Sequence, residues 1–210
     1  MSDDDDSIVV SVDNLIGSTL DERLETVAGY LRMVHLHTKI DKGAGAFWAL
    51  QTTLVSLLSE ALVFCKDRKS DAATSVLHNA TSLIVQLSHD EDDSGYICSK
   101  LCSPGDRLLE AMGECLLDTK QSFHVSEMIV YTLANICAES NHSLKQQVIE
   151  RACLVDYFDR MTNNLDQRMA VILPWALQNL FVAGMAFFLD SEEVVPSCIK
   201  LSATCLNHIL

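Results

Sequence analysis

The cysteines come nearest, among the residues of this chain, to the spacing of a reactive site. Cys98 and Cys102 are four residues apart, so on a helix both thiols share one face that a metal ion could use. A zinc site of the finger type needs a second Cys or His pair, and none follows at the required spacing. Most of the eight cysteines lie in apolar periodic segments, where a free thiol behaves as a small hydrophobic group. Buried thiols in a reducing, intracellular compartment are therefore the favoured interpretation.

Motifs of common catalytic sites are missing from the sequence. It contains no glycine-rich phosphate loop, no Gly-x-Ser-x-Gly elbow and no His-Glu-x-x-His pattern. Cys115 and Cys153 stand near charged residues, but no spaced histidine accompanies either of them. We therefore expect a protein that is not an enzyme and that needs no cofactor or metal.

The charge balance narrows the range of partners. The formal net charge is −14, whereas binding to a nucleic-acid backbone needs Lys and Arg surfaces that release counterions. Such a charge is compatible with a basic protein partner. The first residues are acidic, unlike a signal peptide, and no apolar run reaches the roughly 18 residues of a spanning helix. We expect protein partners and neither nucleic acid nor membrane.

The elements that position these residues are expected to be helices. Three prolines and eight glycines are few for 210 residues, which fits helices better than a sheet rich in turns. Apolar residues from Leu20 to Val34 recur at three- and four-residue steps, which predicts a helix. Ser18, just before this stretch, is the predicted N-cap. Ser103-Pro104 predicts another helix start, and Ser143 to Gln146 reads as a capping box. Further helices are expected over about 46–65, 71–87, 96–102, 104–118 and 124–139, then one helix or a helix pair over 143–161, and another helix from 166 onward.

One six-residue pattern occurs twice. Tyr131-Thr-Leu-Ala-Asn135-Ile and Trp175-Ala-Leu-Gln-Asn179-Leu both place an aromatic residue four positions before an asparagine. That interval is one helical turn, so the two side chains share a face. Asn135 and Asn179 are 44 residues apart, and helical units that recur at about 40–47 residues are typical of HEAT and armadillo proteins.

The stretch from Val125 to Leu180 resembles armadillo repeats, and its sequence motif is most similar to that of the importin-alpha family. In that family the third helix of each repeat carries Trp-Ala-Leu-x-Asn on a concave wall. The resemblance implies an all-α fold, a right-handed superhelical solenoid of about four armadillo- or HEAT-like repeats over residues 18–210. Gln86 lies 49 residues before Asn135 and would occupy the asparagine position of an eroded repeat.

The resemblance also implies a binding surface. Asparagines of this family bond the backbone of an extended peptide, and tryptophans pack the stems of its lysines and arginines. By position, Asn135 and Asn179 match the asparagine sites, Gln86 replaces one, Trp175 matches a tryptophan site, and Tyr131 replaces a tryptophan. The alternative is that these residues only preserve the packing of the repeat.

Residues 1–17 form a separate acidic segment, which we expect to be a flexible tail. Asp3 to Asp6 and Ser7 precede the apolar run Ile8, Val9, Val10, Ser11 and Val12. One interpretation is a solvated tail. The other is a resemblance to a SUMO-interacting motif, in which β-branched residues pair as a strand with an exposed sheet edge. The acidic run would then face basic residues beside that edge.

The sequence favours a non-catalytic adaptor or scaffold of armadillo type, nuclear or nucleocytoplasmic, with a tail that binds SUMO or a sumoylated protein. A nuclear-import adaptor that carries basic peptides in its groove is one alternative, and a structural subunit of an obligate complex is another. The chain differs from importin-alpha in having room for four or fewer repeats. It also begins with an acidic rather than a basic segment.

Overall fold

The computed structural model describes residues 19–41, 44, 48, 52–89, 94–118, 120–138, 142–181 and 194–209. Within these ranges the chain forms ten α-helices and no strand, so the prediction of an all-α protein is confirmed there. None of the described helices is long and apolar enough to cross a lipid bilayer. The segment 1–17, with Ile8, Val9, Val10 and Val12, lies outside the described residues.

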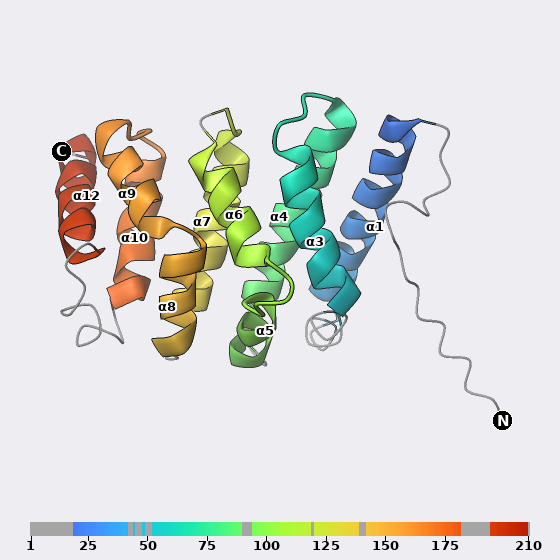
Figure 1. The fold of residues 1–210 in the computed structure, drawn as a ribbon, viewed down its shortest axis with the longest axis horizontal. Coiled ribbons are helices and arrows are strands. Elements are labelled where there is room, and N and C mark those ends of the chain that lie inside the picture. Colours follow the sequence, from blue (N-terminus) through green and yellow to red (C-terminus); the bar gives the residue numbers. More distant parts are fainter. Residues whose placement is uncertain are drawn as a thin grey trace.

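Most helices stack side by side in two layers (Figure 1). One layer, in which each helix packs on the next, consists of α1 (Leu20–Ile40), α4 (Asp71–Ser88), α7 (Phe123–Ala138) and α10 (Met169–Phe181). The other, also packed in order, consists of α3 (Thr52–Cys65), α6 (Leu108–Leu117), α9 (Leu154–Asn163) and α12 (Val194–Ile209). The short helices α5 (Ser94–Leu101) and α8 (His142–Arg151) lie along the lower edge in Figure 1. The result is an elongated array with α1 and α12 at opposite ends.

A unit of three helices occurs twice in succession. The first unit is α5, α6 and α7, and the second is α8, α9 and α10. α5 and α8 start 48 residues apart, at 94 and 142, while α6 and α9 start 46 apart, at 108 and 154. In both units the residue before the second helix has a left-handed backbone, with φ of 53° at Arg107 and 50° at Cys153. The same backbone turn therefore opens the equivalent helix of each unit.

The first described helix begins one residue later than predicted. Thr19, not Ser18, is the N-cap of α1. The Thr19 hydroxyl accepts from the Glu22 amide at 3.2 Å, and the Glu22 carboxylate accepts from the Thr19 amide at 2.9 Å. This reciprocal capping box satisfies two backbone donors at once, so it fixes the helix start at Leu20.

Two other predicted helix starts are wrong. α6 begins at Leu108 rather than Pro104, because the preceding residues form a turn held by another helix. Asp106 donates its backbone N–H to the Ser103 carbonyl, and its carboxylate accepts from the Ser56 hydroxyl of α3 at 2.8 Å. α8 begins at His142, so Ser143 lies inside the helix and cannot be its N-cap.

A continuous apolar core runs between the two layers. Seven of the eight cysteines are buried in it or beside it, and Cys153 is half-buried. The side chains of Cys98 and Cys102 are 0% and 1% exposed. The interpretation of these thiols as buried hydrophobic groups is therefore confirmed.

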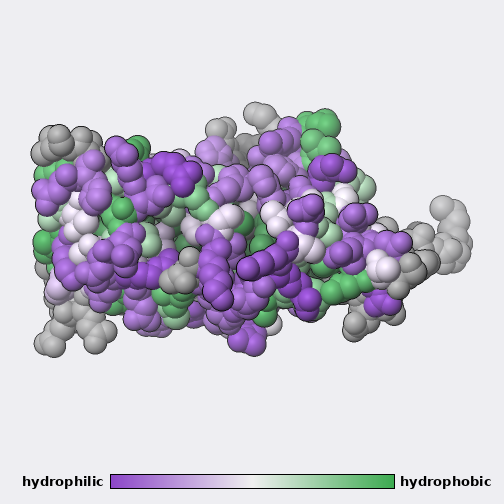
Figure 2. Space-filling model, turned by 90° about the horizontal axis from the view of Figure 1, so that it is seen from above, coloured by the Kyte–Doolittle hydropathy of each residue, from purple (hydrophilic) through white to green (hydrophobic). Residues whose placement is uncertain are grey.

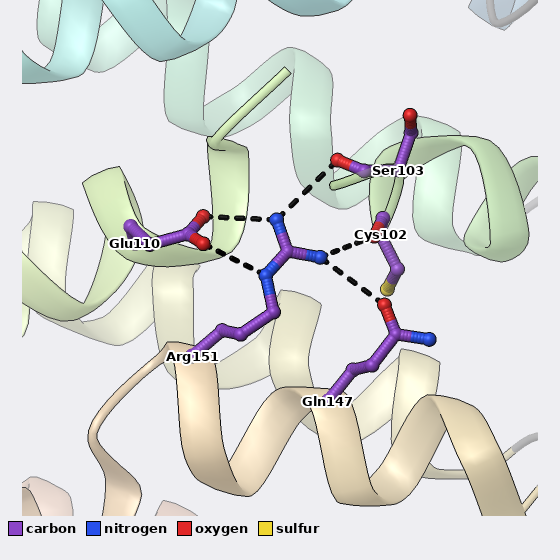
Figure 3. Close-up of polar contacts among 5 residues, drawn as sticks. All are labelled: Cys102, Ser103, Glu110, Gln147 and Arg151. Carbon is purple, nitrogen blue, oxygen red and sulfur yellow. Dashed lines mark hydrogen bonds and ion pairs between the residues drawn. The ribbon is translucent and has the colours of Figure 1, made fainter. Parts of the chain in front are cut away.

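Arg151 joins the two three-helix units (Figure 3). Its guanidinium donates two parallel bonds to the Glu110 carboxylate of α6, from Nε to Oε1 at 2.8 Å and from Nη2 to Oε2 at 2.9 Å. It also donates to the carbonyls of Cys102 at 2.5 Å and Ser103 at 3.3 Å, just beyond α5. A cation here satisfies carbonyls that the end of a helix leaves without partners. These bonds tie α5, α6 and α8 together.

Gly113 allows the same two units to approach closely. A Cβ atom at this position of α6 would lie 2.7 Å from the backbone oxygen of Ala152, between α8 and α9. Real Cβ contacts are essentially never this short, and the obstacle is backbone rather than a flexible side chain. Only glycine fits without a shift of one unit against the other.

Candidate functional site

The predicted aromatic and asparagine residues lie on the layer formed by α4, α7 and α10. Tyr131 and Asn135 are one turn apart on α7, and Trp175 and Asn179 are one turn apart on α10. Because α7 packs against α10, the Tyr131 and Trp175 rings meet, with centroids 5.5 Å apart and planes inclined at 57°. We call these four residues, with Gln86 of α4, the aromatic–asparagine row.

The two asparagines connect neighbouring helices. Asn135 Nδ2 donates to the Ser88 hydroxyl of α4 at 3.0 Å. Asn179 Nδ2 donates to the backbone oxygen of Ala134 on α7 at 3.3 Å. Each asparagine therefore bonds to the preceding helix of its layer, and the bond fixes the orientation of its amide. Both asparagines therefore help to hold neighbouring helices together, as the alternative interpretation of the motif predicted.

Gln86 occupies a position that matches Asn135 in burial. With a shift of 49 residues, buried positions of α4 such as Val76, Ala80 and Leu83 correspond to buried positions of α7. Gln86 and Asn135 are then both half-buried. The bond to α7 goes to Ser88, two residues after Gln86. Ser88 could not be predicted from the sequence, because a serine near a helix end carries no signal that distinguishes a bridge between helices from a surface residue.

Trp175 belongs to an exposed apolar surface on α10. Its side chain is 39% exposed, and Val171, one turn earlier, is 68% exposed. Pro174 lies inside α10 and is exposed as well. Large aromatic side chains are usually buried in folded proteins. An exposed tryptophan beside an exposed valine and a second aromatic ring is therefore a surface that a partner could cover.

Two charged residues that were not predicted from the sequence lie close to the row, Lys145 and Glu127. Lys145 of α8 is only 1% exposed, and its ammonium donates to the Asn179 backbone oxygen at 3.2 Å. Glu127 lies one turn before Tyr131 on α7, with its carboxylate 3.9 Å from the His124 imidazole. A cation thus contacts the backbone at Asn179, and an acidic residue lies one turn before Tyr131 on α7.

A pair of imidazole rings links α4 to α7 near the same surface. The rings of His78 and His124 have centroids 4.0 Å apart. Burial lowers the pKa of His78, and the neighbouring His124 lowers it further. Both rings carrying a charge would repel each other, so acidification opposes this contact.

Burial disfavours ionisation of most of the thiols. Burial raises the pKa of Cys65 to about 11 and that of Cys102, Cys115, Cys137 and Cys198 to about 12. A nucleophilic or metal-binding cysteine acts as the thiolate and usually has a lowered pKa. Within the described ranges, no three His, Cys, Asp or Glu side chains are grouped to hold a metal ion.

Comparison of the chain with protein-family models, curated proteins and solved structures finds no match.

Proposed function

We propose that this chain is a non-catalytic adaptor or scaffold of the armadillo-repeat type, organised as a right-handed superhelix of about four repeats. The repeated three-helix unit supports this, because its helices recur at 46 and 48 residues, close to the period of HEAT and armadillo proteins. Stacked repeats expose an extended surface that commonly serves binding. We propose a nuclear or nucleocytoplasmic location on the importin-alpha resemblance.

The observation that carries the proposal is the exposed Trp175 beside Tyr131. Binding energy concentrates in a few residues, and tryptophan and tyrosine are prominent among them. Asn135 and Asn179 lie one turn further along the same helices, and an asparagine amide has two donors and one acceptor. One internal bond orients each amide without exhausting its capacity. An extended peptide segment of a protein partner fits such a row.

A nuclear-import adaptor that binds basic peptides in the groove is the second candidate. The net charge of −14 and the position of Glu127, one turn from Tyr131, favour it. Lys145, bonded to the backbone oxygen of Asn179, weighs against it, because a buried cation repels lysine and arginine. We therefore place the general peptide-binding adaptor first.

Affinity capture with the full chain tests the adaptor. Proteins recovered with the wild type are compared with those recovered with Trp175→Ala plus Tyr131→Ala. The matched control is Ile199→Ala plus Met33→Ala, which truncates exposed apolar residues on α12 and α1. We expect a discrete set of proteins lost only with the aromatic pair, and direct binding of a purified segment from one of them. Identical sets for all three proteins would reject the proposal.

A lysine-rich peptide distinguishes the second candidate. Calorimetric titration into the full chain should show binding that Trp175→Ala with Asn179→Ala abolishes if the chain carries basic cargo. No heat, or heat unchanged in the variant, rejects a basic-peptide groove. The third candidate, a structural subunit of an obligate complex, predicts self-association or instability of the isolated chain, which mass measurement at low concentration checks.

The N-terminal segment is proposed as a second contact, to SUMO or a sumoylated protein. Its support is the apolar run Ile8, Val9, Val10 and Val12 beside Asp3 to Asp6. NMR titration with SUMO should move the Val9, Val10 and Val12 resonances and leave those of α7 and α10 in place. Unchanged valine resonances would eliminate this contact.

A further inference from the structure

A cavity lined by polar and apolar side chains lies apart from the aromatic–asparagine row, and the two connections that form it lie at the upper edge of the molecule in Figure 1. Its volume is about 500 Å³, within the range of pockets that hold small ligands or single residues. It is formed where the connection from α6 to α7 meets α9 and the connection from α9 to α10. Figure 2 looks onto this edge, whose surface is mainly hydrophilic with smaller hydrophobic areas.

Residues that carry unpartnered polar atoms concentrate around this cavity. Among the described residues, five buried side-chain nitrogen or oxygen atoms have no hydrogen-bond partner in the protein. Four of them belong to residues that line the cavity: Asp118 Oδ2, Gln121 Nε2, Tyr157 Oη and Arg160 Nη1. Burying such atoms without partners costs about 1–3 kcal/mol each. Their concentration in one place indicates a site that a ligand completes.

Each of these groups is already held in position. Asp118 Oδ1 accepts from the Lys120 amide at 2.9 Å, and Gln121 Oε1 accepts from the Ser122 amide at 3.1 Å. Arg160 Nη2 donates to the backbone oxygen of Leu116. In each of these three side chains, one terminal atom bonds to the backbone and the other has no partner in the protein.

Tyr157 is the most deeply buried member of the set. Its side chain is only 1% exposed, so packing fixes its ring while its hydroxyl has no partner in the protein. Burial also raises the pKa of Tyr157, so the hydroxyl keeps its proton at neutral pH. It can therefore donate one hydrogen bond and accept others.

The charges of the lining exclude a simple ion. Asp118 and Asp166 supply two negative charges, and Arg160 and Arg168 supply two positive ones. Arg168 is already engaged, with its guanidinium 3.2 Å from Asp166 and 3.7 Å from the centre of the Phe123 ring. A lone anion would meet Asp118, and a lone cation would meet Arg160. A neutral group with a donor beside an acceptor suits both.

We propose that this cavity binds an amide group, either a glutamine or asparagine carboxamide or a backbone amide, from a peptide segment of a protein partner. The amide oxygen accepts from Arg160 Nη1, Gln121 Nε2 or the Tyr157 hydroxyl, and its N–H donates to Asp118 Oδ2. Phe123, Met161 and Met169 supply the apolar walls for the attached carbon chain. This contact does not depend on the aromatic–asparagine row, since it uses none of its residues.

NMR titration of the full chain with small probes tests the assignment. The probes are propionamide, propionate, propylammonium and glutamine capped at both ends as a peptide mimic. We expect propionamide and capped glutamine to shift the Gln121 side-chain amide and the Met161 methyl, with capped glutamine binding more tightly. Propionate and propylammonium should leave both signals unchanged.

Two conservative variants supply the check on mechanism. Tyr157→Phe and Asp118→Asn should each weaken binding of capped glutamine about three- to tenfold, the loss of one hydrogen bond. Met33→Ala, on the distant α1, should leave the affinity unchanged. Tyr157→Phe should keep or raise thermal stability, because it removes a buried hydroxyl without a protein partner. If Tyr157→Phe fails to fold, Asp118→Asn alone decides.

Three outcomes would overturn the proposal. If no probe shifts the two signals, the cavity holds water only. If propionamide binds but capped glutamine does not, the site takes a small free amide and not a peptide. Affinity unchanged by both variants would place the binding elsewhere.

Discussion

Single atoms decide how closely the two three-helix units approach each other. The contact of Gly113 with the Ala152 backbone and the bonds of Arg151 to Glu110 lie at the same junction. The contact of Gly113 depends on the absence of a Cβ atom. The contact of Arg151 depends on a guanidinium that bonds several groups at once. Substitutions at this junction therefore test the stacking of the units directly.

We expect Gly113→Ala to destabilise the protein by about 1–3 kcal/mol, the usual cost of overpacking. The sign of the change in unfolding free energy is informative, because alanine in place of a helical glycine otherwise stabilises a protein by about 1 kcal/mol. Here the added Cβ would meet the Ala152 backbone oxygen at 2.7 Å. Urea unfolding followed by circular dichroism measures the change.

Gly29→Ala on α1 is the matched control. No atom outside its own helix lies within 4 Å of a Cβ at this position, so we expect a gain of about 0.5–1 kcal/mol. Stabilisation by both substitutions would contradict the close contact of α6 with Ala152.

The Glu110–Arg151 pair predicts a dependence of stability on pH. Hydrogen bonds from Arg151 hold the pKa of Glu110 below its ordinary value. The folded state therefore binds the proton less readily than the unfolded state. The stabilisation is present above the ordinary pKa of glutamate, near 4.5, and it is lost as the pH falls through the lower folded-state value.

Glu110→Gln should accordingly cost about 1–2 kcal/mol at neutral pH. The difference in unfolding free energy between wild type and variant should shrink as the pH falls below 4.5. Urea titrations at several pH values give that difference, in which the other acidic residues cancel. A gap that stays constant down to the lowest pH would contradict the ion pair.

At the scale of helices, the asparagines connect the layer formed by α4, α7 and α10. We expect Asn135→Ala to lose about 0.5–1.5 kcal/mol, because the bond from Asn135 to Ser88 is broken. A double-mutant cycle with Ser88→Ala should give a coupling energy of about 0.5–1.5 kcal/mol. Additive effects would mean that the two side chains do not interact.

The helices were predictable in part, and the reasons differ from helix to helix. Apolar periodicity predicted α1 because a core face leaves a three- and four-residue pattern in the sequence. The start of α6 was not predictable from Ser103-Pro104, because Asp106 bonds to Ser56 of α3 and Arg107 takes a left-handed backbone. At this position a contact between segments distant in the sequence determines where the helix starts, and the local sequence pattern does not.

The candidate sites were also predictable only in part. The spacing of Tyr131, Asn135, Trp175 and Asn179 predicted residues on shared helix faces, and the structure brings the two rings into contact. The direction of the asparagine bonds was not predictable, since Ser88 carries no recognisable signal. The cavity was missed for a similar reason. Asp118 and Tyr157 are 39 residues apart in the chain and belong to no motif.

At the scale of the whole molecule, the described helices form an elongated array in which each helix packs mainly on its neighbours. This arrangement offers long surfaces on either layer, and the exposed Trp175 and Val171 lie on the layer of α1, α4, α7 and α10. We propose that this surface of α7 and α10 binds a partner, while the corresponding exposed residues elsewhere do not.

Site-specific photocrosslinking can show whether a partner covers this surface. Benzoylphenylalanine replaces Val171, which is 68% exposed one turn before Trp175, or Ile199 of α12, which is 64% exposed. We predict that the probe at position 171 crosslinks a discrete partner in cells, that Trp175→Ala abolishes this product, and that position 199 yields none. The same crosslinked products at both positions, or products unaffected by Trp175→Ala, would contradict it.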